Sequence, residues 1–269
     1  MARLKGGADY GKSKDPSNRG QIERFSPEGV FLALYPWLRD GVFYVEDDFA
    51  EDTISATRWN VSNTAAGDGT NFAWTAARSG TVQGSTGASD DHAISINGDA
   101  LWYGDANCGM EVRFKIDVVT GLSFEIGFTD ALTDEDLPAV TDVDTPTTGN
   151  GATDVAVIHL DTDQTLTTAA LVGESTGKPY AAQKANIATW TPSAATWYVV
   201  RVQLETDGAF CKIFDTTTPS QPVLVSGSDT GKPLMLDGAT AVRPHMLFRT
   251  RNTTPKVVDI DYIRCWQDR

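Results

Sequence analysis

The sequence predicts an all-β protein, an antiparallel β-sandwich of the jelly-roll type that follows an extended N-terminal arm. Two observations predict this class. After residues 1–40, short runs of alternating apolar and polar residues follow one another, separated by Gly, Asp, Thr and Pro, and helical periodicity is nearly absent. The chain has 269 residues, which is enough for one large sandwich with a substantial core. We therefore divide it into an arm, 1–40, and a sandwich domain, 41–269.

The arm combines a polar, basic start with one compact apolar run. Residues 1–24 contain six basic and three acidic side chains, and residues 29–41 read GVFLALYPWLRDG, where Pro36 would disrupt a long helix. Such a segment can order on a partner protein and bury an aromatic anchor there, or it can fold back over the edge of its own sandwich. The candidate partner-binding residues are Val30, Phe31, Leu34, Tyr35, Trp37 and Leu38.

Charge and composition exclude several classes of partner and compartment. The chain carries a net charge of −14, and the part after residue 24 carries −17 because the basic arm is set apart from it. An acidic body repels nucleic acid and anionic membranes, so we expect neither as its partner. The start, MARLKGGADYGKSKD, lacks the apolar run of a signal peptide, and we expect synthesis in a cytoplasm. The three cysteines (Cys108, Cys211 and Cys265) predict buried free thiols rather than a disulfide framework or a zinc site.

Two long segments with period-two alternation predict strand pairs. GMEVRFKIDVV at 109–119 and GLSFEIGFTD at 121–130 are separated by a short turn, so we expect an antiparallel hairpin. WYVVRVQLETDGAFCKIFD at 197–215 predicts a second hairpin around Asp207 and Gly208. Further strands are expected at 92–96, 100–103, 154–160 and 244–250.

The first and last strand-like segments carry a family resemblance. VFYVEDDFAEDTISATRWNVS, at 42–62, contains an acidic-aromatic DDF element that leads to a Trp, and VDIDYIRCW, at 258–266, has one apolar and one acidic face. Together they resemble the opening and closing strands of the concanavalin A-like lectins and glucanases, and 197–215 is similar to a hairpin of the same superfamily. The resemblance implies a jelly roll in which strand 42–49 lies beside strand 257–266.

The glucanases of that superfamily use a strand motif of the form Glu-x-Asp-x-(x)-Glu, and the resemblance places it at Glu125–Asp130. Gly127 stands where the assisting Asp belongs, and Thr129 or Asp130 stands where the acid-base Glu belongs. Retaining hydrolysis needs two carboxylates with separate roles. We therefore expect no enzyme activity, and we interpret Glu125 as a polar-face carboxylate that pairs across the sheet with Lys115, Arg113 or Arg201.

Three other groups of residues are weaker candidates for a site. His92, His159 and His245 are scattered through the sequence, which favours strand-face histidines over ligands or bases. The acidic residues in loop-like segments are interpreted as solvated carboxylates, and the alternative is that they bind a structural calcium ion. No other cofactor is expected. Four aromatic residues are interpreted as packing at the edge of the core, and the alternative is that they stack on sugar rings. The acidic residues are Asp142, Asp144, Asp161 and Asp163, and the aromatic residues are Trp74, Trp102, Tyr103 and Trp190.

Two classes of function follow from these features. The first is a non-enzymatic virion protein, which resembles the head decoration proteins of tailed bacteriophages: a capsid decoration or cement protein that its arm anchors to the major capsid protein or another shell protein. Self-association as a homo-oligomer is open under this hypothesis. The alternative is a carbohydrate-binding, receptor-binding or tail-fibre module, or a glycan-active enzyme, and it leaves the arm unexplained.

Overall fold

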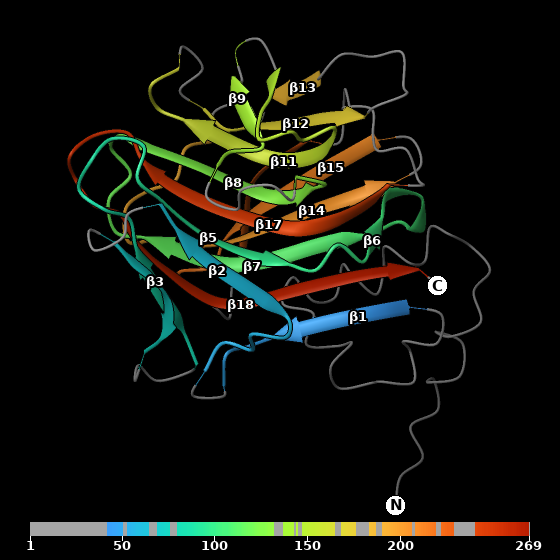
Figure 1. Ribbon diagram of the computed structural model, residues 1–269, viewed down its shortest axis with the longest axis horizontal. Coiled ribbons are helices and arrows are strands. Elements are labelled where there is room, and N and C mark those ends of the chain that lie inside the picture. The colour runs from blue at the N-terminus through green and yellow to red at the C-terminus, as the bar shows by residue number, and fades with distance from the viewer. Residues whose placement is uncertain are drawn as a thin grey trace, which may run out of the picture.

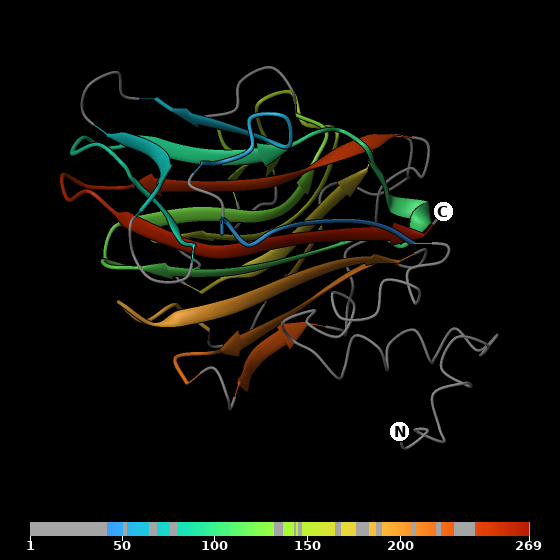
Figure 2. The ribbon, with the colours of Figure 1, turned by 90° about the horizontal axis from the view of Figure 1, so that it is seen from below.

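The computed structural model describes most of the chain after residue 41 as two packed β-sheets (Figures 1 and 2). The described residues are 42–50, 53–64, 69–75, 80–131, 137–142, 144, 147–164, 168–175, 183–186, 190–205, 208–218, 222–228 and 240–268. The predicted arm, with its partner-binding residues Val30, Phe31, Leu34, Tyr35, Trp37 and Leu38, lies outside them. No helix in the described part has the length and apolar character needed to cross a bilayer.

The first sheet, called the β7 sheet after a central strand, is antiparallel throughout. β1 adds to it by pairing with the C-terminal half of β18. Its strands, in spatial order, are β16 (Val223–Ser228), β15 (Gly208–Asp215), β14 (Trp197–Glu205), β7 (Gly109–Ile116), β18 (Val257–Asp268), β4 (Val82–Ser85) and β3 (Thr70–Trp74), with β1 (Val42–Asp47) beside β18.

The second sheet, called the β8 sheet, faces the first (Figure 2). It is antiparallel as well, and β6 pairs with the start of β17. Its strands, in spatial order, are β13 (Gln183–Asn186), β12 (Ala170–Ser175), β11 (Asp154–Asp161), β8 (Leu122–Thr129), β17 (Ala241–Thr250), β5 (Ala93–Gly98) and β2 (Trp59–Asn63), with β6 (Trp102–Tyr103) beside β17. A short pair, β9 (Val140–Asp142) with β10 (Thr147–Thr148), and the 3-10 turn η3 (Gly104–Ala106) complete the described elements.

The core fills the space between the sheets with the apolar half of each alternating strand. Met110, Val112 and Phe114 of β7 point inward, as do Phe124 and Phe128 of β8, and all five are essentially inaccessible. Burial of such side chains stabilises the fold by about 1.5–3 kcal/mol each. Cys108, Cys211 and Cys265 lie in the same core as buried free thiols, as predicted, and burial raises the pKa values of Cys108 and Cys265.

The predicted all-β sandwich is confirmed, and so are two of its strand pairs. β1 and β18 are antiparallel neighbours in a register that runs from Val42 opposite Asp268 to Asp47 opposite Ile263. β14 and β15 pair from Tyr198 opposite Asp215 to Glu205 opposite Gly208. The chain therefore pairs its first described strand with its last, as the DDF and closing motifs indicated.

The hairpin predicted from 109–119 and 121–130 is wrong. β7 pairs with β14 and β18, whereas β8 pairs with β11 and β17, so the two strands belong to different sheets. Their apolar faces meet across the core, where the rings of Phe114 and Phe124 lie 6.1 Å apart. Alternation predicts that one face of a strand is buried. Two such strands can be neighbours in one sheet, or they can lie in opposite sheets with their apolar faces in contact, and the alternation is the same in both cases.

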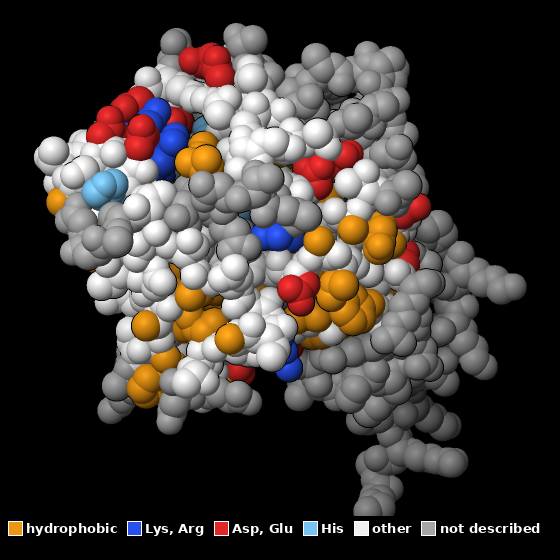
Figure 3. Space-filling model, in the orientation of Figure 1, with side chains coloured by type: hydrophobic (Ala, Val, Ile, Leu, Met, Phe, Trp, Pro, Cys, Tyr) orange, Lys and Arg blue, Asp and Glu red, His pale blue; other side chains and the backbone are white. Residues whose placement is uncertain are grey.

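Exposed hydrophobic and charged side chains gather in different parts of the surface. Figure 3 shows hydrophobic side chains gathered over the lower half of one face, near β1, β2 and β6 of Figure 1, and adjoining acidic and basic groups at the upper left. Among the described residues, the exposed large hydrophobic side chains are Leu101, Tyr103, Leu137, Val223 and Leu224.

Candidate functional site: a buried glutamate beneath a covering segment

The outer face of the β8 sheet, which points away from the β7 sheet, carries the residue predicted to be a degenerate catalytic carboxylate. Phe124 and Ile126 point into the core, so Glu125 between them points outward. It is nevertheless completely inaccessible to solvent. Residues 137–142 and 147–152, which include β9 and β10 and are called the cover here, lie over this part of the sheet (Figure 1).

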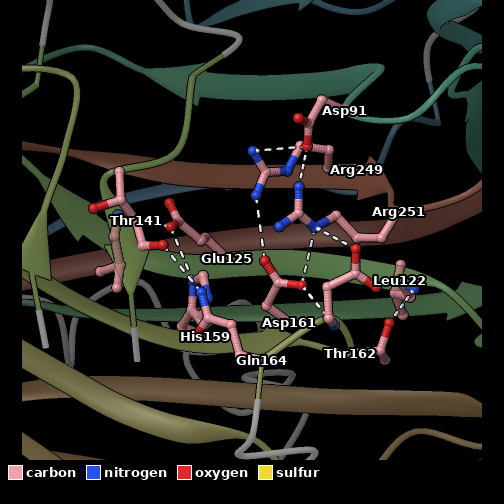
Figure 4. Close-up of polar contacts among 12 residues, drawn as sticks. Asp91, Leu122, Glu125, Thr141, His159, Asp161, Thr162, Gln164, Arg249 and Arg251 are labelled. Carbon is pink, nitrogen blue, oxygen red and sulfur yellow. Dashed lines mark hydrogen bonds and ion pairs between the residues drawn. The ribbon is translucent and has the colours of Figure 1, made fainter. Parts of the chain in front are cut away.

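The cover is packed onto the sheet by a second, smaller apolar cluster, separate from the main core. Its members are small or β-branched, which lets the cover approach the outward side chains of β11 and β12 closely. They are Ala131, Ala139, Val140, Ala152, Val155, Val157, Ala170 and Val172. A hydrogen bond from the Gln164 side chain to the Thr141 carbonyl, 3.0 Å long, fastens the cover further (Figure 4).

Four donors surround the carboxylate of Glu125. Oε1 accepts from the backbone N–H of Val140 at 2.8 Å and from His159 Nδ1 at 3.1 Å. Oε2 accepts from the backbone N–H of Ala139 at 2.8 Å and from His245 Nε2 at 3.1 Å. A carboxylate only accepts hydrogen bonds, so both ring nitrogens that face it carry a hydrogen.

These contacts set the charge state of Glu125. Burial by itself raises the pKa of a carboxylic acid, but hydrogen bonds and positive charge from His159 and His245 act the other way. The combined effect of the two histidines is larger than that of burial, so the pKa of Glu125 lies below its ordinary value. The side chain is thus an ionised anchor whose lone pairs are occupied.

A polar row extends from Glu125 across four neighbouring strands. Asn97 of β5 lies 2.7 Å from Nδ1 of His245 on β17, and its side-chain amide reaches Ser95 Oγ at 3.0 Å. On the other side of Glu125, His159 projects from β11 directly opposite it. The two histidines that the sequence interpretation treated as scattered therefore converge on one carboxylate, and His92 lies apart from them on the connection before β5.

The ion pair predicted for Glu125 is wrong, because the three basic residues lie in the other sheet. Arg113 pairs with Asp261 at 2.5 Å, Lys115 with Asp259 at 2.8 Å, and Arg201 with Glu111 at 2.6 Å. Each basic group thus has its acidic partner within the β7 sheet, and Glu125 is satisfied by histidines and backbone amides instead.

The strand positions after Glu125 differ from the glucanase motif in their local structure, and Gly127 has no room for a side chain. A Cβ atom placed on Gly127 would lie 2.1 Å from the carbonyl oxygen of Ala156 on the neighbouring strand, which is a backbone clash. The Thr129 hydroxyl accepts the N–H of Ala131. Asp130 holds the turn before β11 by accepting the backbone amides of Thr153 and Asp154.

The acidic loop residues divide into two environments. Asp161 is fully buried, not solvated as predicted, and it pairs with Arg251 at 3.0 Å and with Arg249 at 3.3 Å beside the Glu125 site (Figure 4). Asp142 caps its own turn by accepting the N–H of Asp144, and Asp163 lies 3.7 Å from Arg251. Within the described ranges, no three His, Cys, Asp or Glu side chains are arranged to hold a metal ion.

The four candidate aromatic residues do not form one groove. Trp102 and Trp190 are buried in the main core, where Trp102 packs on Phe43 and Trp190 packs on Tyr198. Trp74 is half-buried at the end of β3, and Tyr103 is 39% exposed beside η3. The core-edge interpretation is confirmed for Trp102 and Trp190.

Comparison with known proteins places the fold. No protein-family model matches the sequence, and no curated protein matches it. A protein of unknown function from Shewanella oneidensis MR-1 superposes with a TM-score of 0.52 at 13% identity, covering 84% of this chain and 87% of that one. This likeness shows a shared fold.

Two further structures have lower scores. An immunostimulatory antigen and pseudo β-1,3-glucanase of Mycobacterium tuberculosis gives a TM-score of 0.49 at 12% identity, covering 85% of this chain and all of that one. The exoplasmic/lumenal domain of VIP36, in a form bound to Ca²⁺ and Man3GlcNAc, gives 0.46 at 11% identity, covering 78% and 83%.

Proposed function

We propose that this chain is a non-catalytic jelly-roll protein that acts through protein–protein contacts. The observation that carries the proposal is the state of Glu125, which is buried under the cover with both oxygens occupied. A nucleophile or general acid must reach its substrate, and retaining hydrolysis needs a second carboxylate about 5 Å away. At the positions where the resemblance places that second carboxylate, the Thr129 hydroxyl accepts the N–H of Ala131, and Asp130 accepts the backbone amides of the turn before β11.

The finer proposal is a capsid decoration or cement protein that its N-terminal arm anchors to a virion shell. Its support comes from the sequence. The basic start of the arm and its apolar run at 29–41 suit a docking segment, and the acidic body suits a soluble domain that projects from a particle. The contacts of the arm would then supply the attachment, with Phe31, Tyr35 and Trp37 as the aromatic anchors.

Two measurements test these proposals separately. The full-length chain should release no reducing sugar from a panel of β-glucans, and turnover that Glu125→Gln abolishes would overturn the non-catalytic assignment. Purified particles from infected cells should contain the chain at a fixed copy number per shell, and Trp37→Ala should lower that number. Absence of the chain from purified particles would overturn the virion assignment and leave the non-catalytic one standing.

A carbohydrate-binding module is the second candidate, and one observation favours it. Three neighbouring polar atoms on the outer face of the β8 sheet, Ser123 Oγ, His159 Nε2 and Arg249 Nε, are buried without a hydrogen-bond partner among the described residues. A hydroxyl-bearing ligand that reached this face of the sheet would supply partners for them. A glycan array probed with the full chain, and with Ser123→Ala as the comparison, decides between the two candidates.

A further inference from the structure

Two exposed apolar side chains lie on the segment between β5 and η3. Leu101 is 51% exposed and Tyr103 is 39% exposed, whereas Trp102 between them is buried in the main core. Because neighbouring residues of an extended segment point to opposite sides, Leu101 and Tyr103 share the side that faces away from the core. Together they are called the β6 patch here. Apolar side chains that lie together on a surface mark contact sites, unlike single exposed ones.

The β6 patch is fixed to both sheets. β6 pairs with the start of β17 in the β8 sheet, and Gln267 of β18 holds the patch to the β7 sheet. The Gln267 side chain donates from Nε2 to the Leu101 carbonyl at 3.0 Å, and its Oε1 accepts the N–H of Tyr103 at 3.0 Å. The backbone that carries both apolar side chains is thus held in place before anything binds, which lowers the entropic cost of binding.

The arm joins the sandwich beside this patch. Val42, the first residue of β1, directly follows the apolar run of the arm and lies opposite Asp268. The next residue, Phe43, lies opposite Gln267, and its ring packs on that of Trp102 at 5.2 Å. Figure 1 shows the start of β1, the end of β18 and β6 at the same end of the sandwich. The apolar run therefore begins its path next to the β6 patch.

The apolar run, residues 29–41, has the reach to cover the patch. Leu38 is four residues from Val42 and Phe31 is eleven, so a fully extended backbone carries them at most about 14 Å and about 40 Å away. A binding segment on so short a tether is present at an effective concentration in the mM range. A second copy of the chain would have to reach that concentration to compete, so the favoured occupant is the arm of the same chain.

The run and the surroundings of the patch also match in chemistry. The aromatic and aliphatic side chains of the run would remove the apolar surface of the β6 patch from water. Asp99 and Asp105, both exposed, flank the patch. The arm is the basic part of the chain, since residues 1–24 carry six basic and three acidic groups and Arg39 lies within the run. Opposite charges thus meet around an apolar centre, which favours this pairing over other surfaces of the acidic body.

We propose that the apolar run 29–41 docks on the β6 patch of its own sandwich in the free chain. The inference does not depend on the virion assignment, because it concerns the chain before it meets a partner. If the chain joins a particle, Phe31, Tyr35 and Trp37 leave the patch for the shell. The patch then competes with the shell for the same side chains.

Paramagnetic broadening in NMR spectra of the full-length chain tests the proposal. A nitroxide is attached through Ala33→Cys in the middle of the run, and the three native cysteines are buried and do not compete for the label. The amide signals of Leu101 and Tyr103 should lose most of their intensity. Those of Val223 and Leu224, on the edge strand β16 at the other side of the β7 sheet, should keep theirs. Equal intensities at the two places would overturn the proposal.

Two double variants separate docking from mere tethering. Leu101→Ser with Tyr103→Ser keeps the tether and removes the apolar patch, so the broadening at the Gln267 amide should fall by half or more. Val223→Ser with Leu224→Ser is the matched control, because it removes side chains that are 59% and 57% exposed elsewhere, and it should leave that broadening unchanged. Undiminished broadening at Gln267 in the first variant would overturn the proposal, since the tether alone would then account for it.

A mixture of two samples tests which copy supplies the arm. Isotope-labelled chain without a nitroxide is mixed with unlabelled Ala33→Cys that carries one. The signals of Leu101 and Tyr103 should keep their intensity in this mixture, because each patch is covered by its own arm. Broadening there would assign the patch to the arm of a second copy and overturn docking within one chain.

Discussion

Two buried glutamates on opposite outer faces of the sandwich show how one residue type is used in two ways. Glu125, on β8, is held by two histidines and by two backbone amides of the cover. Glu111, on β7, is held by side chains wherever the structure describes its partners: Arg201 donates to Oε2 at 2.6 Å, Tyr262 to Oε1 at 3.0 Å, and Arg264 to Oε1 at 3.4 Å. The first glutamate binds a chain segment, and the second binds neighbouring strands of its own sheet.

The pKa values of the two carboxylic acids shift in opposite directions. For Glu111 burial is the larger effect, and its pKa is raised despite the charges of Arg201 and Arg264 and the hydroxyl of Tyr262. For Glu125 the hydrogen bonds and charges of His159 and His245 outweigh burial, and the pKa is lowered. A neutral replacement should therefore be tolerated better at Glu111 than at Glu125.

Glu125→Gln should have the largest effect on stability. The amide NH₂ of glutamine would face hydrogen-bond donors and leave at least one of the Ala139, Val140, His159 and His245 groups unsatisfied in a buried site. We expect a loss of about 3–5 kcal/mol in the free energy of unfolding, the usual cost of breaking a buried charged network. Urea denaturation measures it, and a loss near zero would show that the site is open to solvent.

Glu111→Gln should cost less, about 1–2 kcal/mol. The replacement keeps an acceptor for Tyr262 and for Arg201, whose carboxylate partner it removes, and Arg264 keeps its ion pair with Glu46. It also removes a charge whose burial is penalised. The same denaturation experiment provides the comparison with Glu125→Gln under identical conditions. A larger loss for Glu111→Gln than for Glu125→Gln would reverse the contrast between the two sites.

The pH dependence of the two losses should run in opposite directions. The stabilisation from Glu125, whose folded pKa is lowered, is present above the unfolded value of about 4.3 and is lost as pH falls from there. Glu111, whose folded pKa is raised, favours the folded state while protonated and loses that contribution as pH rises. Unfolding free energies from about pH 7 to pH 3.5 should show the Glu125→Gln loss shrinking and the Glu111→Gln loss growing as pH falls. Parallel slopes would contradict this assignment.

Gln164→Ala should have the smallest effect. It removes the hydrogen bond from the Gln164 side chain to the Thr141 carbonyl at the rim of the cover. This bond is exposed, so we expect a loss of about 0.5–1 kcal/mol. Thermal denaturation of this variant and of Glu125→Gln under the same conditions would compare the two contacts that hold the cover. Equal losses of stability would show that Glu125 is not the main contact.

Much of the fold could be predicted from the sequence, because alternation and end motifs report on local burial. The strand at 258–266 and its partner at 42–49 are examples, and so is the hairpin at 197–215. The pairing of 109–119 with 121–130 failed because a short connection serves both a hairpin and a crossing between sheets. Sequence alternation fixes which face is buried, and it does not fix which strand lies alongside.

The candidate site was only partly predictable, for a related reason. Glu125 was identified by its place in a recognisable strand motif, and its neighbours Gly127 and Thr129 indicated the missing carboxylates. His159 and His245 are 34 and 120 residues away from it in sequence, and only the registers of β11 and β17 against β8 bring them to it. One available signal was His159 itself, a polar residue between buried apolar neighbours on β11.

Amide hydrogen exchange at Ala139 and Val140 tests most directly the claim that Glu125 anchors the cover rather than catalyses a reaction. Both amides donate to Glu125, so the wild-type chain should protect them strongly. In Glu125→Gln the protection factors of these two amides should fall by a larger factor than those of core amides on β7. In Glu111→Gln the ratio of their protection factors to those of the same core amides should stay as in the wild type. Equal protection of Ala139 and Val140 in the wild type and in Glu125→Gln would contradict the anchoring role.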